Sequence, residues 1–151
     1  MWVQNMMTGY RIKTVPEDFI VTEFPKLDID ISGNIGCYVL TKKGISTFDA
    51  IEYICNELQL SKKNFDFAGL KDEDGITIQY ISYVGAVINN TEMIIDNERF
   101  ITLNYFGKLS SRIKTGMLYG NGFNIVVRNL EREYVNSIDY RKKRGSLYKL
   151  F

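Results

Sequence analysis

The segment Phe67 to Asp72 could carry chemistry, because a short apolar run there ends on a lysine followed by a carboxylate. A carboxylate that stays ionised and reaches a substrate can act as a nucleophile. The residues alone favour a plainer interpretation, since Lys71 to Gly75 has the composition of a polar turn, in which aspartate bonds to its own backbone. Asp72 is therefore a candidate nucleophile with a turn residue as the alternative.

Two further segments accompany this aspartate. Lys13 to Phe19 reads Lys-Thr-Val-Pro-Glu-Asp-Phe, and Gly116 to Phe123 reads Gly-Met-Leu-Tyr-Gly-Asn-Gly-Phe. In this order, and with Thr77 and Gln79 after Asp72, the three segments resemble the TruD family of tRNA pseudouridine synthases. The family's later Gln-Arg-Phe-Gly motif is absent, so the resemblance covers its N-terminal part, roughly residues 10–130.

The resemblance implies an intramolecular isomerase that converts a uridine of tRNA, at position 13 in typical members, to pseudouridine. The reaction breaks the bond from ribose C1′ to uracil N1, turns the base over and reattaches it through C5. It needs no cofactor and no metal. It does need a carboxylate nucleophile, a cation that keeps it ionised, a flat surface for the detached base and access to a flipped nucleotide.

The resemblance also assigns three catalytic positions. Asp72 would be the nucleophile, Lys13 its ion-pair partner and Asn121 a further active-site residue. A lysine in a strand more commonly points into solvent. Asn121 precedes Gly122, and Asn-Gly is a standard turn signal, so a turn that aims Asn121 into the site is a second interpretation.

Four more residues would contact or support the substrate. Phe123 and Phe19 are candidates for stacking on the base, an interaction that contributes about 1–3 kcal/mol. Both could instead be core residues, and a core role is favoured for Phe19. Thr77 and Gln79 are grouped with the substrate-binding residues and are expected to buttress the Asp72 loop, with ordinary strand positions as the alternative.

Composition narrows the remaining possibilities. The net charge is +1, so any RNA contact must come from local basic patches, of which Lys108 to Lys114 and Arg141 to Arg144 are the most suggestive. Histidine is absent, which removes imidazole as a base, ligand or pH switch. Cys37 and Cys55 lack partners at ligand spacing. Glu73 and Asp74 follow the candidate nucleophile and would repel phosphate.

Hydrophobic periodicity predicts one main helix and several strands. The helix is expected at Thr47 to Leu60, capped by Ser46 or Thr47. A Gly-punctuated connection is expected at Gly107 to Gly122, and Glu131 to Phe151 reads as a helical and then basic segment with a break at Gly145. The predicted strands are Tyr10 to Val15, Phe19 to Phe24, Gly36 to Thr41, Phe65 to Leu70, Ile76 to Val84, Ile101 to Phe106 and Phe123 to Arg128.

These elements predict an α+β fold: a partial pseudouridine-synthase catalytic domain with a mixed or antiparallel sheet, a main helix at about 47–60 and a C-terminal helical segment. We expect residues 1–151 to form a single domain without the family's insertion domain, in a cytoplasmic protein with tRNA as partner and no membrane contact. An unfinished sheet edge would allow homo-oligomers. The alternative function is a truncated, inactive relative or fragment that binds only RNA or a partner protein.

Overall fold

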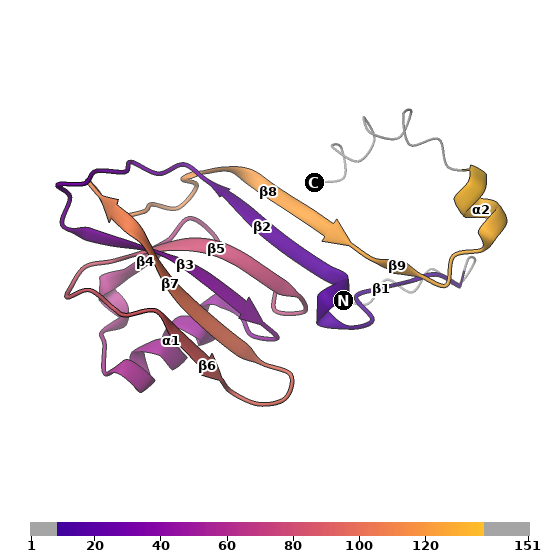
Figure 1. Ribbon diagram of the computed structural model, residues 1–151, viewed down its shortest axis with the longest axis horizontal. Coiled ribbons are helices and arrows are strands. Elements are labelled where there is room, and N and C mark those ends of the chain that lie inside the picture. The colour runs from indigo at the N-terminus through magenta and orange to yellow at the C-terminus, as the bar shows by residue number, and fades with distance from the viewer. Residues whose placement is uncertain (1–8, 138–151) are drawn as a thin grey trace.

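Strands supply most of the regular secondary structure over residues 9–137, the part of the chain that the computed structural model describes. Seven of them form a mixed sheet in the order β6-β7-β3-β5-β2-β8, with β4 paired to β5 outside this path (Figure 1). The elements in chain order are β1 (Arg11–Ile12), η1 (Pro16–Asp18), β2 (Phe19–Pro25), β3 (Ile35–Lys43), α1 (Thr47–Leu58), η2 (Lys62–Asn64), β4 (Phe65–Phe67), β5 (Ile76–Tyr83), β6 (Thr91–Ile94), β7 (Phe100–Leu109), β8 (Leu118–Ile125), β9 (Val127–Arg128) and α2 (Arg132–Ser137). The predicted α+β class with a mixed sheet and one main helix is confirmed.

Helix α1 forms where the apolar periodicity predicted it and covers one face of the sheet (Figure 1). The Ser46 hydroxyl accepts a hydrogen bond from the Asp49 N–H at 3.1 Å, which satisfies one of the free amides of the first turn. The helix ends at Leu58, two residues earlier than predicted, because Gln59 adopts a left-handed conformation. Its buried face packs on side chains of β3, β5 and β7: Tyr38, Leu40, Ile81, Tyr83, Ile101 and Leu103.

Strand β5 joins the two halves of the sheet. It is antiparallel to β3 along its whole length, from Gly36 opposite Tyr83 to Lys43 opposite Ile76. On its other edge β5 pairs first with β2, in parallel, and then with β4, antiparallel. The parallel β2–β5 pair is what makes the sheet mixed.

The predicted boundaries of the last strands are wrong. The Gly-punctuated connection expected at Gly107 to Gly122 contains the end of β7 and much of β8, which pairs antiparallel with β2 from Leu118 to Ile125. Asn121 therefore lies inside a strand and not in a turn. Strand β6 was not predicted. The glycines of β8 made this strand hard to predict from the sequence. Its extended conformation comes from the backbone hydrogen bonds to β2 and not from β-branched side chains.

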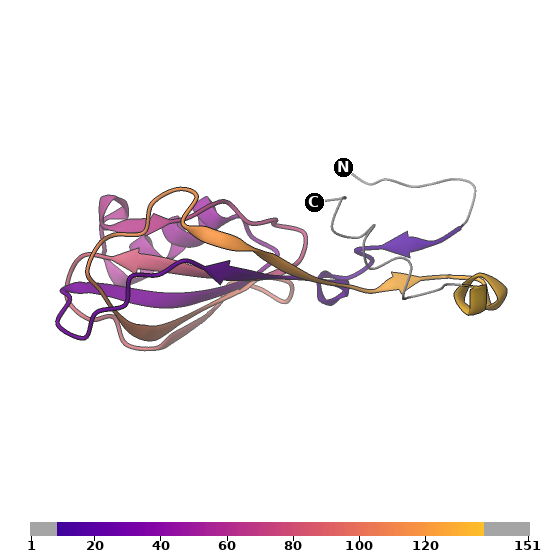
Figure 2. The ribbon, with the colours of Figure 1, turned by 90° about the horizontal axis from the view of Figure 1, so that it is seen from above.

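The short pair β1–β9 extends beyond the end of the sheet (Figure 2). Arg11 pairs with Arg128 and Ile12 with Val127, so only two residues of the strand predicted at Tyr10 to Val15 form a ladder. Helix α2 occupies part of the predicted C-terminal helical segment, and the remainder of that segment lies outside the described residues. None of the helices in residues 9–137 is long and apolar enough to cross a membrane.

Candidate active site

The loop that carries Asp72, residues 68–75, lies beside the edge of β5 at which the strand partner changes from β2 to β4. β2 pairs with β5 only at Ile76 to Ile78, and β4 takes over the same edge at Ile81 to Tyr83. Residues 68–75 connect β4 back to β5 and pass over this division. The loop ends in very close contact with β2, since a Cβ on Gly75 would lie 2.2 Å from the Phe19 carbonyl oxygen. Only glycine fits there, so the backbone of β2 fixes one end of the loop.

The carboxylate of Asp72 has two separate contacts. Lys13 Nζ lies 2.6 Å from Oδ2, and the Asp74 N–H donates to Oδ1 at 3.0 Å. The second contact is the turn bond that aspartate makes to its own backbone. The two interpretations of Asp72 drawn from the sequence are thus compatible, because one oxygen shapes the turn while the other contacts the ammonium.

Lys13 reaches Asp72 through an unusual backbone conformation. Its φ is +53°, in the left-handed region that residues other than glycine rarely adopt. Its ammonium also lies 4.1 Å from the centroid of the Phe19 ring, within the range of a cation–π contact. Strained residues of this kind persist only where the surrounding structure holds them, and they concentrate at functional sites.

The charge state of Asp72 follows from these neighbours. Burial raises its pKa, but the hydrogen bonds from Lys13 and the Asp74 N–H, together with the positive charges of Lys13 and Lys42, outweigh burial. The pKa of this carboxyl therefore lies below its ordinary value of 3.8. About a third of the side chain is exposed. Asp72 is thus an accessible carboxylate at neutral pH.

Two aromatic rings lie beside the Lys13–Asp72 pair. The Phe19 and Phe123 ring centroids are 6.0 Å apart and the rings are tilted by 46°. Phe19 is buried, whereas 38% of Phe123 is exposed. In the β2–β8 ladder Phe123 is opposite Val21 and Asn121 opposite Glu23, so both face the same side as Phe19. Pairwise contacts thus connect Asp72 to Lys13, Lys13 to Phe19 and Phe19 to Phe123, with Asn121 exposed two residues along β8.

Gln79 supports the loop from the interior, where its side chain is fully buried. Its Nε2 donates to the Gly69 carbonyl at 3.1 Å, and its Oε1 accepts from the Thr47 hydroxyl at 2.8 Å. Thr47 Oγ1 in turn accepts from the Lys71 N–H at 3.0 Å. Thr77 is equally buried, and its hydroxyl has no hydrogen-bond partner among residues 9–137. Neither Thr77 nor Gln79 presents a side chain to a nucleotide, so supporting the loop is the role that the contacts of Gln79 serve.

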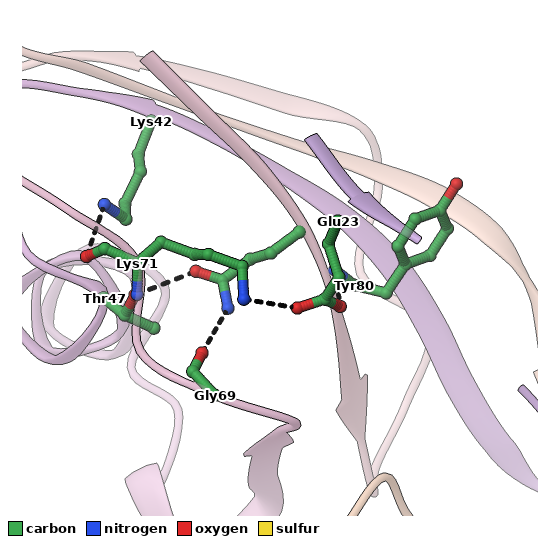
Figure 3. Close-up of polar contacts among 7 residues, drawn as sticks. Glu23, Lys42, Thr47, Gly69, Lys71 and Tyr80 are labelled. Atoms are coloured by element: carbon green, nitrogen blue, oxygen red, sulfur yellow. Dashed lines mark hydrogen bonds and ion pairs between the residues drawn. The ribbon is translucent and has the colours of Figure 1, made fainter. Parts of the chain in front are cut away.

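A buried ion pair occupies the division between β2 and β4. Lys71 Nζ lies 2.7 Å from Glu23 Oε2, with 5% and 0% of the two side chains exposed (Figure 3). Glu23 Oε1 accepts from the Tyr80 N–H at 3.2 Å. Tyr80 lies in β5 between the residues that pair with β2 and those that pair with β4. Its N–H therefore has no strand carbonyl opposite it, and the Glu23 carboxylate accepts that hydrogen bond instead.

A second ion pair ties β9 to the segment before β2. Arg128 donates from Nε and Nη2 to the two carboxylate oxygens of Asp18, at 2.6 and 2.7 Å. Arg128 also pairs with Arg11 in the β1–β9 ladder. Asp18 is 2% exposed. Arg128 therefore contacts the segment that carries Lys13 at both ends, through the backbone ladder at Arg11 and through the ion pair at Asp18.

Sequence reasoning missed several residues that build the site: Asp18, Glu23, Lys42, Lys71 and Arg128. Strand alternation could have revealed two of them. Glu23 continues the buried series of Phe19 and Val21, and Lys42 continues that of Tyr38 and Leu40. A charge at the next position of a buried face indicates a residue retained for a polar contact. Lys42 is fully buried, which also removes it from the basic surface.

A cavity of about 620 Å³ adjoins the site. Side chains of both charges line it: the cations Lys13, Lys43 and Arg99 and the carboxylates Glu17, Glu73 and Asp74. Within residues 9–137 no three cysteine, aspartate or glutamate side chains are grouped as metal ligands would be. The arrangement is suited to a polar substrate that approaches an ionised carboxylate beside aromatic rings.

The fold is that of known pseudouridine synthases. A crystal structure from Methanosarcina mazei, described as a "putative tRNA pseudouridine synthase D (TruD)", superimposes with a TM-score of 0.71 and 26% sequence identity, covering 99% of this chain and 32% of the other. The chain therefore has the catalytic-domain fold of an RNA-modifying enzyme class.

Sequence comparisons narrow the class to one family. The family model for tRNA pseudouridine synthase D (TruD) matches residues 2–145. The tRNA pseudouridine synthase D of Aquifex aeolicus is 36% identical over 126 residues, which cover 81% of this chain and 32% of the relative. A protein of Pyrococcus furiosus named a probable tRNA pseudouridine synthase D is 35% identical over 144 residues, covering 95% and 34%. This chain belongs to the TruD family, and it spans about a third of the length of these relatives.

Proposed function

We propose that this chain carries the uridine-isomerising site of a TruD-type tRNA pseudouridine synthase, with Asp72 as the nucleophile. The observation that carries the proposal is the contact of 2.6 Å between Lys13 Nζ and Asp72 Oδ2 on an accessible, ionised carboxylate. The relatives are named for action on tRNA, and a flipped uridine is the form in which an enzyme of this class receives its base.

Each residue has a defined part in the proposed reaction. Asp72 attacks ribose C1′ and forms an ester as the bond to uracil N1 breaks and the base leaves with the electron pair. The base is held against Phe123, with Phe19 behind it, while it turns. C5 then attacks C1′ and displaces the carboxylate, the C5 proton passes to solvent and N1 takes up a proton. Lys13 keeps Asp72 ionised, and Asn121, exposed on the same side of β8 as Phe123, would bond to the base or ribose.

Loss of the C5 proton provides the test. The chain is incubated with unmodified tRNA tritiated at uracil C5, and tritium release is followed for the wild type and for Asp72→Asn. The substitution keeps the size of the side chain and removes its charge. Release that stops with Asp72→Asn supports the proposal, and equal release by both proteins contradicts it.

A second candidate function is RNA binding without turnover. It is favoured by the partly exposed ring of Phe123 and by Lys13, Lys43 and Arg99 along the cavity, since stacking and positive charge hold RNA whether or not Asp72 reacts. A gel shift with the same tRNA separates the two candidates, since binding by folded protein without tritium release supports the second.

A further inference from the structure

We propose that Lys42 is a positioning residue of this site: its buried ammonium holds the main chain of Asp72 in place and adds a second positive charge behind the carboxylate. The inference rests on the proposed role of Asp72 as nucleophile.

Lys42 occupies a position of β3 at which an apolar residue is expected, because it continues the buried series of Tyr38 and Leu40. It lies near the end of β3, between Thr77 of β5 and Ile101 of β7, and its side chain enters the face covered by α1. It is fully buried. Buried ammonium groups are rare and require compensation, so the contacts of this one indicate what it is retained for.

Those contacts are backbone carbonyls of two loops. Lys42 Nζ donates to the carbonyl oxygens of Ile45 at 2.7 Å and Asp72 at 2.8 Å. Its longer contact, of 3.4 Å, is with the carbonyl oxygen of Lys71 (Figure 3). An ammonium has three donors, and all three are directed at oxygens. Among residues 9–137 no carboxylate lies within ion-pair distance of it. Lys42 thus joins the entry of α1 to the Asp72 loop through the main chain.

The charge of Lys42 acts on Asp72 as well. Its positive charge is one of the influences that lower the pKa of the Asp72 carboxyl. In return, burial lowers the pKa of Lys42 to about 8, although the charges of Asp72 and Glu73 oppose this and that of Lys71 assists it. Its pairing neighbours Thr77 and Ile101 carry no charge. The ammonium that holds the loop is therefore lost as the pH rises through about 8.

The first experiment uses the unaltered chain and needs no activity. The protein is labelled for NMR, and the Lys42 ammonium and the backbone amides of Asp72 to Asp74 are followed between pH about 7 and 10. We expect Lys42 to titrate near pH 8 and the loop amides to shift with the same midpoint. If Lys42 titrates while the loop amides stay constant, the inference is wrong.

Variants separate charge from packing. Lys42→Met should raise the pKa of the Asp72 carboxyl, followed by carbon NMR, and lower tritium release about 10- to 100-fold at neutral pH. Lys42→Arg keeps the charge and should remove the response of the loop near pH 8. The control is Lys62→Met, an exposed lysine paired with Glu52, which should change neither quantity. An unaltered Asp72 pKa in folded Lys42→Met overturns the inference.

The two proposals fail separately. Coupling between Lys42 and the loop without tritium release from any tRNA would contradict the proposed reaction and leave the positioning contact established. Tritium release that is independent of Lys42, with uncoupled titrations, would leave the reaction standing and remove this inference.

Discussion

Arg128 donates two hydrogen bonds, from Nε and Nη2, to the carboxylate of Asp18, which lies 110 positions earlier in the chain. Two-pronged arginine–carboxylate contacts are among the strongest polar contacts in proteins. The pair closes β9 onto the start of β2, and the same arginine lies beside Arg11 in the short ladder that precedes Lys13. Arg128 thus contacts the chain on both sides of Lys13, at Arg11 and at Asp18.

Asp18→Asn should lower the midpoint of urea unfolding at pH 7. The hydrogen bonds from Arg128 outweigh burial and lower the pKa of Asp18 below 3.8, so the stabilisation is fully present above that value and is lost as the pH falls through the lower pKa of the folded protein. The difference between variant and wild type should therefore close in acid. Glu57→Gln, on the exposed side of α1, serves as the control, and a difference that persists unchanged in acid would refute the assignment.

Lys13→Met should raise the pKa of the Asp72 carboxyl. Burial alone raises that pKa, and the Lys13 hydrogen bond and charge are among the influences that reverse it. A carbon NMR titration of Asp72 measures the change, with Lys26→Met as a control from the far end of β2. An Asp72 pKa that is the same in Lys13→Met and in the wild type would show that the contact has no electrostatic effect in solution.

Phe19→Ala and Phe123→Ala should differ in kind. Phe19 is 9% exposed and its loss should cost about 3–5 kcal/mol of unfolding free energy. Phe123 is 38% exposed, and its replacement should cost roughly 1 kcal/mol of stability but weaken RNA binding by about 1–3 kcal/mol. Urea unfolding and a tRNA binding titration measure the two effects. Loss of folding in Phe123→Ala would make it a core residue.

Glu23→Gln should destabilise the protein by about 3–5 kcal/mol, because it leaves the buried Lys71 ammonium without its counter-charge. Adding Lys71→Met should recover part of the loss, and a double-mutant cycle should give a coupling of about 0.5–3 kcal/mol. Both are measured by urea unfolding. Single and double substitutions that simply add would mean that the two groups do not interact.

Cys37 and Cys55 should be unreactive toward a thiol reagent at pH 8 in the folded protein. Both are buried, and burial raises the pKa of Cys37 to about 12 and that of Cys55 above its ordinary value, so neither forms the reactive thiolate. Both should react once urea unfolds the chain. Rapid labelling of the native protein would place one of them at an opening in the core.

The sequence predicted well the parts of the molecule that depend on local pattern. Helix α1 follows from its periodicity and its Ser46 cap, and the closeness of Lys13 and Asp72 followed from the family resemblance. Strand β8 was predicted too late in the chain, since Gly120 and Gly122 carry no side chains that would signal a strand. The hydrogen bonds to the backbone of β2 hold β8 in its extended conformation, although its own sequence gives little sign of a strand.

The buried charges escaped prediction for a different reason. A lysine or glutamate in an alternating strand looks like the solvated face, and only the three-dimensional arrangement shows that Lys42 meets carbonyl oxygens or that Glu23 meets an ammonium. A single domain over residues 1–151, the absence of the insertion domain and self-association through an exposed sheet edge stay predictions. Among residues 9–137 the outer edge of β8 has no strand partner.

The alignment of β8 on β2 places Phe123 opposite Val21 and Asn121 opposite Glu23. Successive residues of a strand point to opposite faces of the sheet. If β8 slid by one position, both side chains would turn away together, and Gly122 would occupy one of the vacated places. A molecule with β8 in the shifted register would keep nearly all of its hydrophobic core, but Phe123 would no longer be available to stack on a base. Correct pairing of β8 with β2 is thus a condition of the proposed function that a measurement of overall stability would hardly detect.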